Sequence, residues 1–387
     1  MRLLHVVPTY LPARRYGGPI VAVHGLCRAL AARGHEVEVY TTSIDGPHDS
    51  PVPHHEPVLL EDVKVRYFAS PWLRRLSYAP ALSETLRKEV NGADVVHLHS
   101  VFLWPTWRAA RIAQDAQIPY VISPRGMLVK RLIEGRNRLV KSAWIGLIEK
   151  SNLEAASAIH ATSEVEREEI EKFGWRLRRM TVVPNAVDDA DEDRHGGAPS
   201  PEIAALGREQ PLILFFGRLA RVKGLHRLLQ AFAKTEHGTL AIVGTDYEGL
   251  APGLMQLANE LLIQHRIRLL PRTITGADKE SVFAAARVFV LPSYSESFGN
   301  SVLEAMQRGL PVIVTPEVGA AQAVRESGGG LVVSGDPETL SRAMDSLAAD
   351  PARAAAMGQD GRRYVSNHYS WESVAARMEA LYESLRN

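Results

Sequence analysis

The chain has 387 residues, enough for two or three domains, and its hydrophobic content of 45% and charged content of 23% are ordinary for a soluble globular protein. A formal net charge of +1 provides no global field that would attract nucleic acid, so no nucleic-acid partner is expected. Cys27 is the only cysteine, which excludes an internal disulfide and a cysteine metal cluster and indicates a reducing compartment.

The amino-terminal segment MRLLHVVPTYLP does not have the pattern of a signal peptide, because His5 interrupts its apolar run and Pro8 ends it. No stretch approaches 18 consecutive apolar residues, so no membrane span is expected. We therefore expect a cytoplasmic protein, with peripheral contact at the inner face of the membrane as an added hypothesis.

Short apolar runs alternate with longer helical patterns through the first half of the chain. After the strand Leu3–Val7, a helical pattern covers Ile20–Arg33 and stops at Gly34. Further strands are expected at Val37–Thr41, Val63–Phe68, Val95–Leu98, Tyr120–Ser123, Ala158–Thr162 and Thr181–Val183. This alternation predicts an α/β domain with a parallel sheet covered by helices on both faces.

A polar stretch interrupts the series at residues 188–200, which read DDADEDRHGGAPS. This composition cannot form a core and is typical of a linker, which we place at residues 186–210. Asp189 and Asp191 superficially match the Asp-x-Asp metal motif of some sugar transferases, but no strand and turn precede them, so we expect no metal there.

A second βα series follows the polar stretch, and its apolar runs predict six more strands. These are Leu212–Phe216, Thr239–Val243, Ile267–Leu270, Val288–Leu291, Val312–Thr315 and Gly330–Val333. We expect two doubly wound domains at residues 1–185 and 211–369, with ligands beyond the carboxyl ends of the strands, where the two domains can face each other across a cleft. Trp371–Leu385 predicts a terminal helix that packs back across the domain junction, so that residues 370–387 join the first domain.

The stretch LPSYSESFGNSVLEAMQRGLPVIV places Glu296 and Glu304 eight positions apart. An apolar strand ends at Pro292, a polar loop carries Glu296, and a helix then carries Glu304 before Gly309 ends it. The amides at such a helix N-terminus attract phosphate, whereas carboxylates beside it suit hydrogen bonds to hydroxyl groups. The pattern indicates a site for a nucleotide sugar or a similar sugar phosphate.

Two other interpretations of this acid pair stay open from the spacing alone. The pair can be two solvated surface charges, or the two carboxylates of a glycoside hydrolase, which lie a fixed distance apart around the scissile bond.

Two cations also follow a predicted strand in the second domain. After Leu212–Phe216 comes GRLARVKG, which carries Arg218 and Lys223 between Gly217 and Gly224, and a helix over His226–Lys234 follows. Glycines let the backbone approach a ligand closely, and the cations suit a phosphate. A solvated basic loop is the alternative, and the matching position of the carboxylate loop argues against it.

Candidate residues in the first domain also lie at strand ends. Gly17 and Gly18 follow the first strand and can face a phosphate or sugar, or can form an ordinary turn. His97 and His99 alternate along one strand and point to the same face, but no third metal ligand has suggestive spacing. We expect His97 to be a hydrogen-bonded core residue, and His99 and Arg125, at strand ends, to be functional.

Taken together, the segments PTYLPARRYGG, GRLARVKG, PNAVD and ESFGNSVLEAMQRGLPV resemble the retaining, family 4 type of GT-B glycosyltransferases, and the resemblance covers nearly the whole chain in order. It implies a GT-B fold of two Rossmann-like domains and transfer of a sugar from a nucleotide-diphosphate donor. The terminal YSWE segment is similar to the start of that family's crossing-back helix.

The resemblance also implies residue roles on the donor side. Arg218 and Lys223 would hold the diphosphate and offset charge on the leaving group, with Gly217 in the same loop. Glu304 would bind the ribose hydroxyls, and Glu296 the donor sugar. The backbone that would hold the donor sugar and phosphate belongs to Phe298, Gly299, Asn300 and Ser301.

In the first domain, the resemblance implies that Gly17 and Gly18 close over the donor, that His99 lies near the reacting sugar, and that Arg125 belongs to the acceptor side. The family needs no metal or other cofactor, and cations with helix dipoles replace the ion. Retention would occur by front-face attack assisted by the leaving phosphate, without an assigned enzymic nucleophile.

Three positions depart from the common pattern. The segment SPRGML stands where many members have a histidine, which puts the acceptor pocket in question. Pro271 and its neighbours replace a common glycine, so the donor base is open between UDP and GDP, and Ala186 replaces a glycine in PNAVD.

Residues 125–150 carry seven basic residues against two acids. The basic ones are Arg125, Lys130, Arg131, Arg136, Arg138, Lys141 and Lys150. Apolar residues are interleaved, and such a segment can lie on an anionic membrane and bring the acceptor domain to a lipid-linked saccharide. A solvated helix face is the alternative.

The sequence therefore predicts a retaining transferase whose partners are a nucleotide sugar and a saccharide or lipid-linked saccharide acceptor, in surface polysaccharide or glycoconjugate synthesis. The alternatives are a sugar-nucleotide epimerase on a similar scaffold, a non-catalytic nucleotide-sugar sensor, and the hydrolase, which needs no diphosphate cations.

Overall fold

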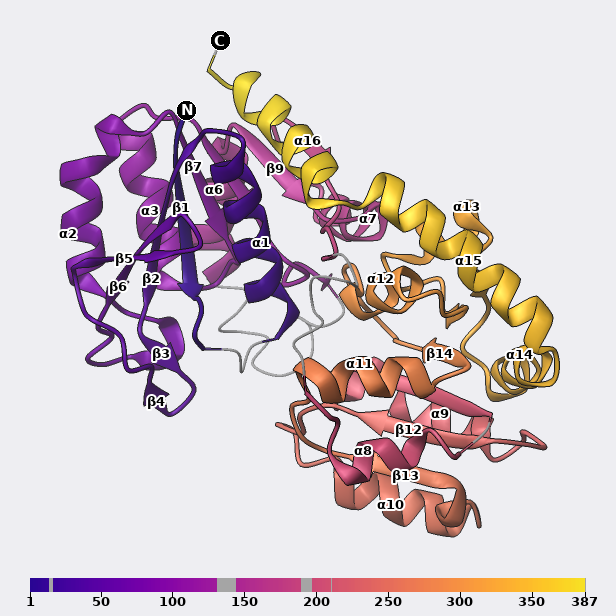
Figure 1. The fold of residues 1–387 in the computed structure, drawn as a ribbon. Helices are drawn as coiled ribbons and strands as arrows, with labels where there is room; N and C mark the ends of the chain where they lie inside the picture. The colour runs from indigo at the N-terminus through magenta and orange to yellow at the C-terminus, as the bar shows by residue number, and fades with distance from the viewer. Residues whose placement is uncertain (14–16, 131–143, 189–196, 210, 387) are drawn as a thin grey trace. The chain divides into compact units, whose positions relative to one another are not determined.

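The computed structural model describes residues 1–13, 17–130, 144–188, 197–209 and 211–386 (Figure 1). The chain divides into two compact units. The first unit comprises Met1–Ala186 and Trp371–Asn387, and the second comprises Val187–Ser370.

An eight-stranded sheet forms the centre of the first unit, in the order β10-β9-β8-β7-β1-β2-β6-β5. Its strands are β1 Arg2–Thr9, β2 Glu36–Thr42, β5 Pro57–Leu60, β6 Val63–Phe68, β7 Val95–His99, β8 Tyr120–Ser123, β9 Ala158–Ala161 and β10 Met180–Val182. All neighbouring strands pair in parallel except β5 and β6. A two-stranded hairpin, β3 Ile44–Asp45 and β4 His48–Asp49, lies outside this sheet.

Helices cover both faces of this sheet. One face packs against α2 Pro80–Glu89, α3 Trp104–Asp115, α6 Lys150–Ala155 and α7 Glu164–Glu171. The other face packs against α1 Gly18–Ala32 and α16 Trp371–Glu383. The described part of this unit also contains the short helical segments η1 Arg74–Leu76, η2 Val90–Gly92 and η3 Ile145–Glu149.

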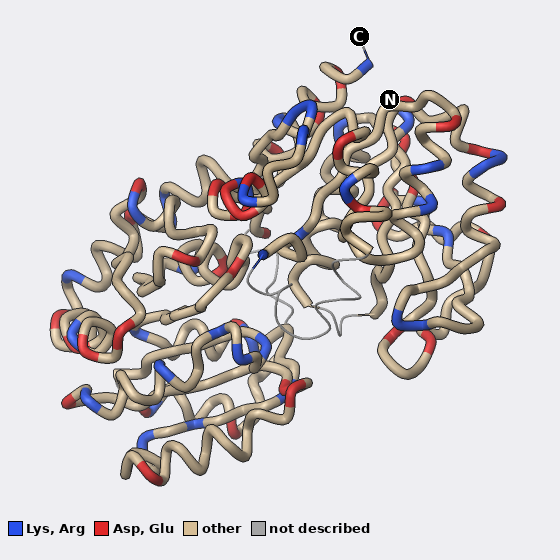
Figure 2. The backbone as a smooth tube through the Cα atoms, turned by 180° about the vertical axis from the view of Figure 1, so that it is seen from behind, with Lys and Arg blue, Asp and Glu red and all other residues tan. Residues whose placement is uncertain are grey.

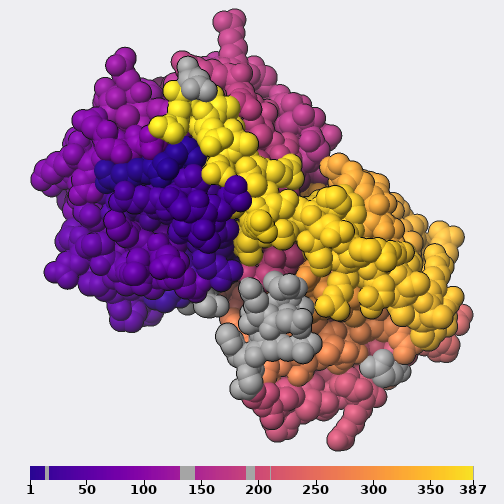
Figure 3. All heavy atoms as spheres, turned by 45° about the horizontal axis from the view of Figure 1, so that its top comes forward, coloured from indigo at the N-terminus to yellow at the C-terminus, as the bar shows by residue number. Residues whose placement is uncertain are grey.

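The terminal helix α16 belongs to the first unit although it follows the second in sequence. Val374, Met378 and Leu381 are buried in the same core as α1, which confirms the apolar face predicted for this helix. A methyl group on Gly25 of α1 would lie 2.1 Å from the Trp371 ring, so a residue without a side chain is required there. Figure 3 shows the yellow chain end lying beside the indigo amino-terminal residues.

A six-stranded parallel sheet forms the second unit, in the order β13-β12-β11-β14-β15-β16. The strands are β11 Leu212–Phe216, β12 Thr239–Val243, β13 Ile267–Leu270, β14 Val288–Leu291, β15 Val312–Val314 and β16 Gly330–Val332. The helices are α8 Pro201–Leu206, η4 Arg221–Lys223, α9 Leu225–Phe232, α10 Ala251–Glu260, η5 Gln264–Arg266, α11 Gly276–Ala285, α12 Asn300–Gln307, α13 Ala321–Ser327, α14 Pro337–Ala349 and α15 Pro351–His368.

The thirteen strand predictions are confirmed within one or two residues at their ends, and so is the doubly wound class of each unit. The prediction that residues 186–210 form a linker is wrong in part. Pro201–Leu206 form α8, whose Ile203 and Leu206 are buried in the core of the second unit. Asp189 and Asp191 lie outside the described residues.

Charges of both signs are interspersed along the backbone of each unit, as Figure 2 shows, in keeping with the net charge of +1. Among the described residues, every helix is too short or too polar to cross a lipid bilayer.

Candidate functional site

In the second unit, the loops after β11 and β14 lie against each other at the carboxyl edge of the sheet. Gly224 makes this approach possible, because its φ of 73° is in the left-handed region and a Cβ there would lie 2.0 Å from the carbonyl oxygen of Pro292. The Tyr294 amide donates to the Val222 carbonyl at 2.8 Å. The segment predicted to carry the phosphate-binding cations therefore contacts the segment predicted to carry the carboxylates.

Arg227 of α9 contacts the loop after β14 and so fixes it to the segment after β11. Its Nε donates to the Pro292 carbonyl at 2.6 Å, and its guanidinium carbon lies 4.0 Å from the centre of the Tyr294 ring. Because Arg227 is buried, substitution would leave the Pro292 carbonyl without its donor. In the sequence, Arg227 is recognisable only as a basic residue early in a predicted helix.

Lys223 and Glu296, one from each loop, form an ion pair. Their side chains are 13% and 17% exposed, so the pair is shielded from bulk water without being sealed off. The backbone fixes Glu296 as well, because its amide donates to Glu317 at 3.1 Å and its carbonyl accepts from Gly319 at 2.9 Å.

The helix α12 begins beside this pair. Gly299 precedes it with φ 96°, and no side chain caps the helix, so its first amides face outward from a backbone turn that only glycine adopts readily. The Phe298 carbonyl accepts from Ala320 at 2.7 Å, which ties this turn to the loop after β15. Asn300 and Ser301 are partly exposed at the helix start.

Glu304, one turn into α12, pairs with Lys279 of α11 across 3.2 Å. Sequence reasoning missed Lys279, and the only sign of it was a basic residue in the first turn of the helix after β13. Arg308 donates to the Glu304 carbonyl at 3.0 Å and pairs with Glu280 at 2.5 Å, which fixes α12 against α11.

Arg218 differs from the two paired lysines. It is exposed directly after Gly217, and among the described residues it has no ion-pair partner. The edge of the sheet thus presents three cations and two carboxylates around one uncapped helix start. Such an arrangement can bind a phosphate through the cations and hydroxyl groups through the carboxylates.

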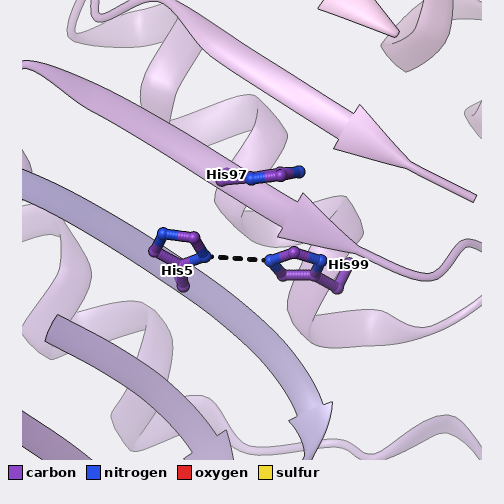
Figure 4. A group of neighbouring side chains, drawn as sticks. All are labelled: His5, His97 and His99. Atoms are coloured by element: carbon purple, nitrogen blue, oxygen red, sulfur yellow. Dashed lines mark hydrogen bonds between the residues drawn. The ribbon is translucent and has the colours of Figure 1, made fainter. Parts of the chain in front are cut away.

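In the first unit, three imidazoles lie together at the centre of the sheet, as Figure 4 shows. His5 of β1 and His97 of β7 face each other across the strand pair, and His5 Nδ1 lies 3.0 Å from His99 Nε2. The prediction that His97 and His99 share a face is confirmed, and β1 adds His5 beside them as a third imidazole that could ligate a metal. Sequence spacing could not reveal it, since 92 positions separate His5 from His97.

Fixed donors and acceptors define the tautomers of this network. Arg125 can only donate, and its Nη2 lies 3.3 Å from His99 Nδ1, so His99 donates from Nε2 to His5. The Val183 carbonyl can only accept, and it lies 2.8 Å from His160 Nε2, so His160 accepts from Ser123 through Nδ1.

His97 lies between the Ser123 hydroxyl and the Tyr382 hydroxyl, 2.6 Å from each, as expected for a hydrogen-bonded core histidine. Because Ser123 donates to His160, His97 donates from Nε2 and accepts from Tyr382 at Nδ1. Within the network, each imidazole lone pair accepts an internal hydrogen bond, so the group fits a metal ion poorly in this arrangement.

Burial keeps these imidazoles neutral. Burial first, and the charge of the nearby Arg125 guanidinium second, lower the pKa of His5 and of His160 to about 3. The pKa of His97 and of His99 is also lowered well below the usual value, first by burial and then by neighbouring groups.

Gly17 and Gly18 lie where the sequence predicts, at the start of α1 beyond the carboxyl end of β1. Gly17 caps the helix with φ 77°. The structure thus gathers Lys223, Glu296, Glu304 and α12 in the second unit, and His99 with Arg125 in the first.

Comparison with known proteins gives one family match in each of the two units. Residues 17–186 match the family described as glycosyl transferase 4-like domain, and residues 200–364 match glycosyl transferases group 1. A D-inositol 3-phosphate glycosyltransferase from Rhodococcus opacus is 30% identical over 96% of this chain and 85% of its own. The chain belongs to the family 4 type of GT-B glycosyltransferases.

Solved structures support the same fold for this glycosyltransferase. A sucrose-phosphate synthase from Thermosynechococcus elongatus superposes with a TM-score of 0.74 at 24% identity, covering 100% of this chain and 99% of that one. Anabaena Alr3699/HepE in complex with UDP-glucose gives a TM-score of 0.74 at 20% identity, covering 99% and 100%.

Proposed function

We propose that this glycosyltransferase moves a sugar from a UDP- or GDP-linked donor to a saccharide or lipid-linked saccharide with retention of configuration, in the synthesis of a surface polysaccharide or glycoconjugate. The main support is the contact between the loops after β11 and β14, where Lys223 forms an ion pair with Glu296 beside the start of α12, which no side chain caps. The solved relative with UDP-glucose supports a uridine donor.

On the donor side, Arg218 and Lys223 hold the diphosphate, and Glu304 accepts hydrogen bonds from the ribose hydroxyls. Glu296, with the backbone at Gly299, holds the donor sugar and the adjoining phosphate. The ion pairs explain how the acids serve this role, because binding a diphosphate frees each carboxylate from its lysine. No metal is needed in this scheme, since three cations offset the charge of the diphosphate.

The reaction breaks the bond between the anomeric carbon and the diphosphate oxygen. The acceptor hydroxyl attacks the same face of the sugar and forms the new glycosidic bond there. Its proton passes to the departing phosphate oxygen, and the nucleoside diphosphate leaves with the bonding electron pair. Arg218 and Lys223 stabilise the charge that develops on that oxygen. Neither Glu296 nor Glu304 acts as general acid or base, so the pair differs from that of a hydrolase.

On the acceptor side, the first unit contributes Arg125, with His99 behind it. His99 is 1% exposed, and its ring nitrogens contact His5 and Arg125. We therefore propose that His99 supports the reacting sugar through Arg125. The Rhodococcus relative is named for D-inositol 3-phosphate, a phosphorylated polyol.

A panel of UDP- and GDP-sugars tests this function through thermal shift, slow donor hydrolysis and transfer to added saccharides. We expect one donor to stabilise the protein and to be hydrolysed slowly, and the anomeric proton coupling of the product to match that of the donor. Binding without turnover under every condition would favour the sensor, and isomerisation of the donor without loss of nucleotide would favour the epimerase.

We also propose that the first unit contacts an anionic lipid surface. Much of the basic segment 125–150 that suggested this falls at residues 131–143, outside the described residues. The described part adds what we call the aromatic surface, two separate groups of rings, one of three and one of two, with contacts of 4.9–6.1 Å within each group, of which Trp72 is exposed. Its members are Trp72, Tyr78, Trp104, Trp107 and Trp144.

Cations border this aromatic surface. The guanidinium of Arg108 lies over the Trp107 ring at 5.5 Å, and its pKa is lowered by burial and by the neighbouring Arg87 and Arg111. Aromatic rings beside clustered cations suit the interface of an anionic membrane.

Vesicle sedimentation tests the contact, with Trp72→Ala/Leu73→Ala as the variant. Both side chains are more than half exposed, as is Leu262 of the second unit, so Leu262→Ala serves as the control. We expect the double variant alone to lose binding to phosphatidylglycerol vesicles at low salt. Equal binding of all three proteins, or none by the wild type, would rule the contact out.

A further inference from the structure

Arg125 places a positive charge inside the first unit, where the charge of Glu166 acts on it without forming an ion pair with it. Its Nη1 donates to Asn185 Oδ1 at 2.7 Å and its Nη2 to His99 Nδ1 at 3.3 Å, and both partners are neutral groups. Its Nε is shielded from solvent and has no partner among the described residues. Within that part of the chain, no carboxylate forms an ion pair with it.

The nearest acid is committed elsewhere. Glu166 of α7 accepts from the Gly126 amide at 2.5 Å through one carboxylate oxygen. Its other oxygen accepts from the amide and the hydroxyl of Thr162, at 2.7 and 2.6 Å. Both oxygens of Glu166 therefore hold the backbone around Arg125, and neither meets the guanidinium.

The backbone at Arg125 is held in a conformation that non-glycine residues rarely adopt. Its φ is 55°, the following Gly126 has φ 76°, and Pro124 precedes them. Strained backbone of this kind persists where the surroundings fix it, and it occurs often at binding sites. This backbone conformation places Arg125 just beyond the carboxyl end of β8, at the edge where ligands bind in such sheets.

The histidines around Arg125 carry no negative charge that could pair with its guanidinium. His99 turns a lone pair toward Arg125 and is neutral, and the low pKa of His5 and of His160, about 3 in each case, keeps those imidazoles uncharged as well. A guanidinium has five N–H groups, of which two have acceptors among the described residues. The others remain for an oxyanion, which a guanidinium binds with two parallel hydrogen bonds.

We propose that Arg125 binds an anionic group of the acceptor, a phosphate or a carboxylate carried near the hydroxyl that is glycosylated. This rests on the proposed transferase function and narrows its acceptor from any saccharide to an acidic or phosphorylated one. The anion accepts hydrogen bonds from the N–H groups of Arg125 that have no acceptor among the described residues, and Asn185 and His99 are positioning residues that orient the guanidinium toward it.

Inorganic phosphate is the first probe, observed through the Nε–H resonances of protein labelled with ¹⁵N-arginine. The protein is first saturated with UDP, so that the donor cations are already occupied. We expect one shielded Nε–H signal, absent from Arg125→Lys, to shift saturably with phosphate. No shift of that signal up to about 20 mM phosphate would overturn the proposal.

Two variants make the result specific. Arg125→Gln should weaken phosphate binding about 10- to 100-fold and leave UDP affinity unchanged. Arg218→Gln, at the donor side, should weaken UDP binding and leave the phosphate response unchanged. Because the phosphate signal belongs to the wild-type protein, the test holds even if Arg125→Gln fails to fold.

The source of the anion is distinguished with glucose 6-phosphate, glucuronate and glucose under the same conditions. A response to glucose 6-phosphate alone assigns a phosphorylated acceptor, and a response to glucuronate alone assigns an acidic sugar. Equal response to glucose contradicts the proposal. Failure of both UDP and GDP to bind would contradict the proposed transferase, whereas failure of phosphate to shift Arg125 with the nucleotide bound would contradict only this inference.

Discussion

Opposite effects of substituting the two members of one ion pair would be the sharpest sign of a donor site. Lys223→Met removes the cation, and Glu296→Gln removes the carboxylate that competes with the diphosphate for that cation. If the pair belongs to a donor site, Lys223→Met weakens UDP binding and Glu296→Gln strengthens it.

The structure sets the size of each effect. A cation about 4 Å from a phosphate in a partly shielded site has a gross attraction of about 4 kcal/mol, and a charge-assisted hydrogen bond contributes about 1.5–3 kcal/mol net. Lys223→Met should therefore weaken binding about 10- to 100-fold. The Lys223–Glu296 pair is mostly shielded, at 13% and 17% exposure, so breaking it to admit UDP costs about 1 kcal/mol. Glu296→Gln should then bind UDP about fivefold more tightly.

Calorimetric titration with UDP and GDP measures both effects, and chromatography of the intact nucleotide sugar follows turnover. Glu296→Gln should lower the rate of donor breakdown while it tightens UDP binding, because the amide no longer holds the sugar as the carboxylate does. The double variant closes a thermodynamic cycle that isolates the coupling of the pair. If both single variants keep the affinity for both nucleotides within about twofold, the pair is merely structural and the donor site is misplaced.

Three further predictions follow from other parts of the structure. In calorimetry, Glu304→Ala should weaken UDP binding about 10-fold without weakening the binding of inorganic pyrophosphate, which lacks ribose and gains access to the released Lys279. Gly224→Ala should lower the free energy of unfolding by more than about 2 kcal/mol in urea, whereas Gly249→Ala, at φ 67° with open space around it, should lose only about 1 kcal/mol. Because the pKa of His5 and of His160 is about 3 in the folded protein and near 6.5 in the unfolded chain, the unfolded state binds more protons below pH 6.5. Each histidine should therefore reduce stability by about 1.4 kcal/mol per pH unit as the pH falls from 6.5 toward 3, and a flat stability between pH 6.5 and 5 would contradict this.

The sequence predicted the central strands well because they are buried on both faces. Several of these strands are continuous apolar runs such as Val288–Leu291, which periodicity detects directly. The edge strand Pro57–Leu60 was missed because its residues alternate between exposed and partly buried, and it begins with a proline. A strand of this kind gains its structure from pairing with β6, which no local pattern encodes.

The candidate site was predicted only where its residues follow a strand in sequence. Glu296 and Lys223 each belong to such a segment, but their contact depends on β11 lying beside β14 in the sheet. The same reason hid His5 and Lys279. Strand order and register set those contacts, as with His5 opposite His97, and a single sequence does not specify them.

The cations of the two units differ in their partners, and this difference is the basis of the ligands that we propose for each unit. In the second unit, Lys223 and Lys279 each have a carboxylate partner, so this part of the site is neutral when empty and both charges become available when a ligand separates them. A ligand with phosphates and hydroxyls in one molecule, such as a nucleotide sugar, satisfies both members of each pair at once. In the first unit, Arg125 hydrogen-bonds only to neutral groups among the described residues, and in our proposal the ligand brings the anion that pairs with it. In our proposal, an anionic acceptor therefore pairs with Arg125 in the first unit, as internal carboxylates pair with the two lysines in the second.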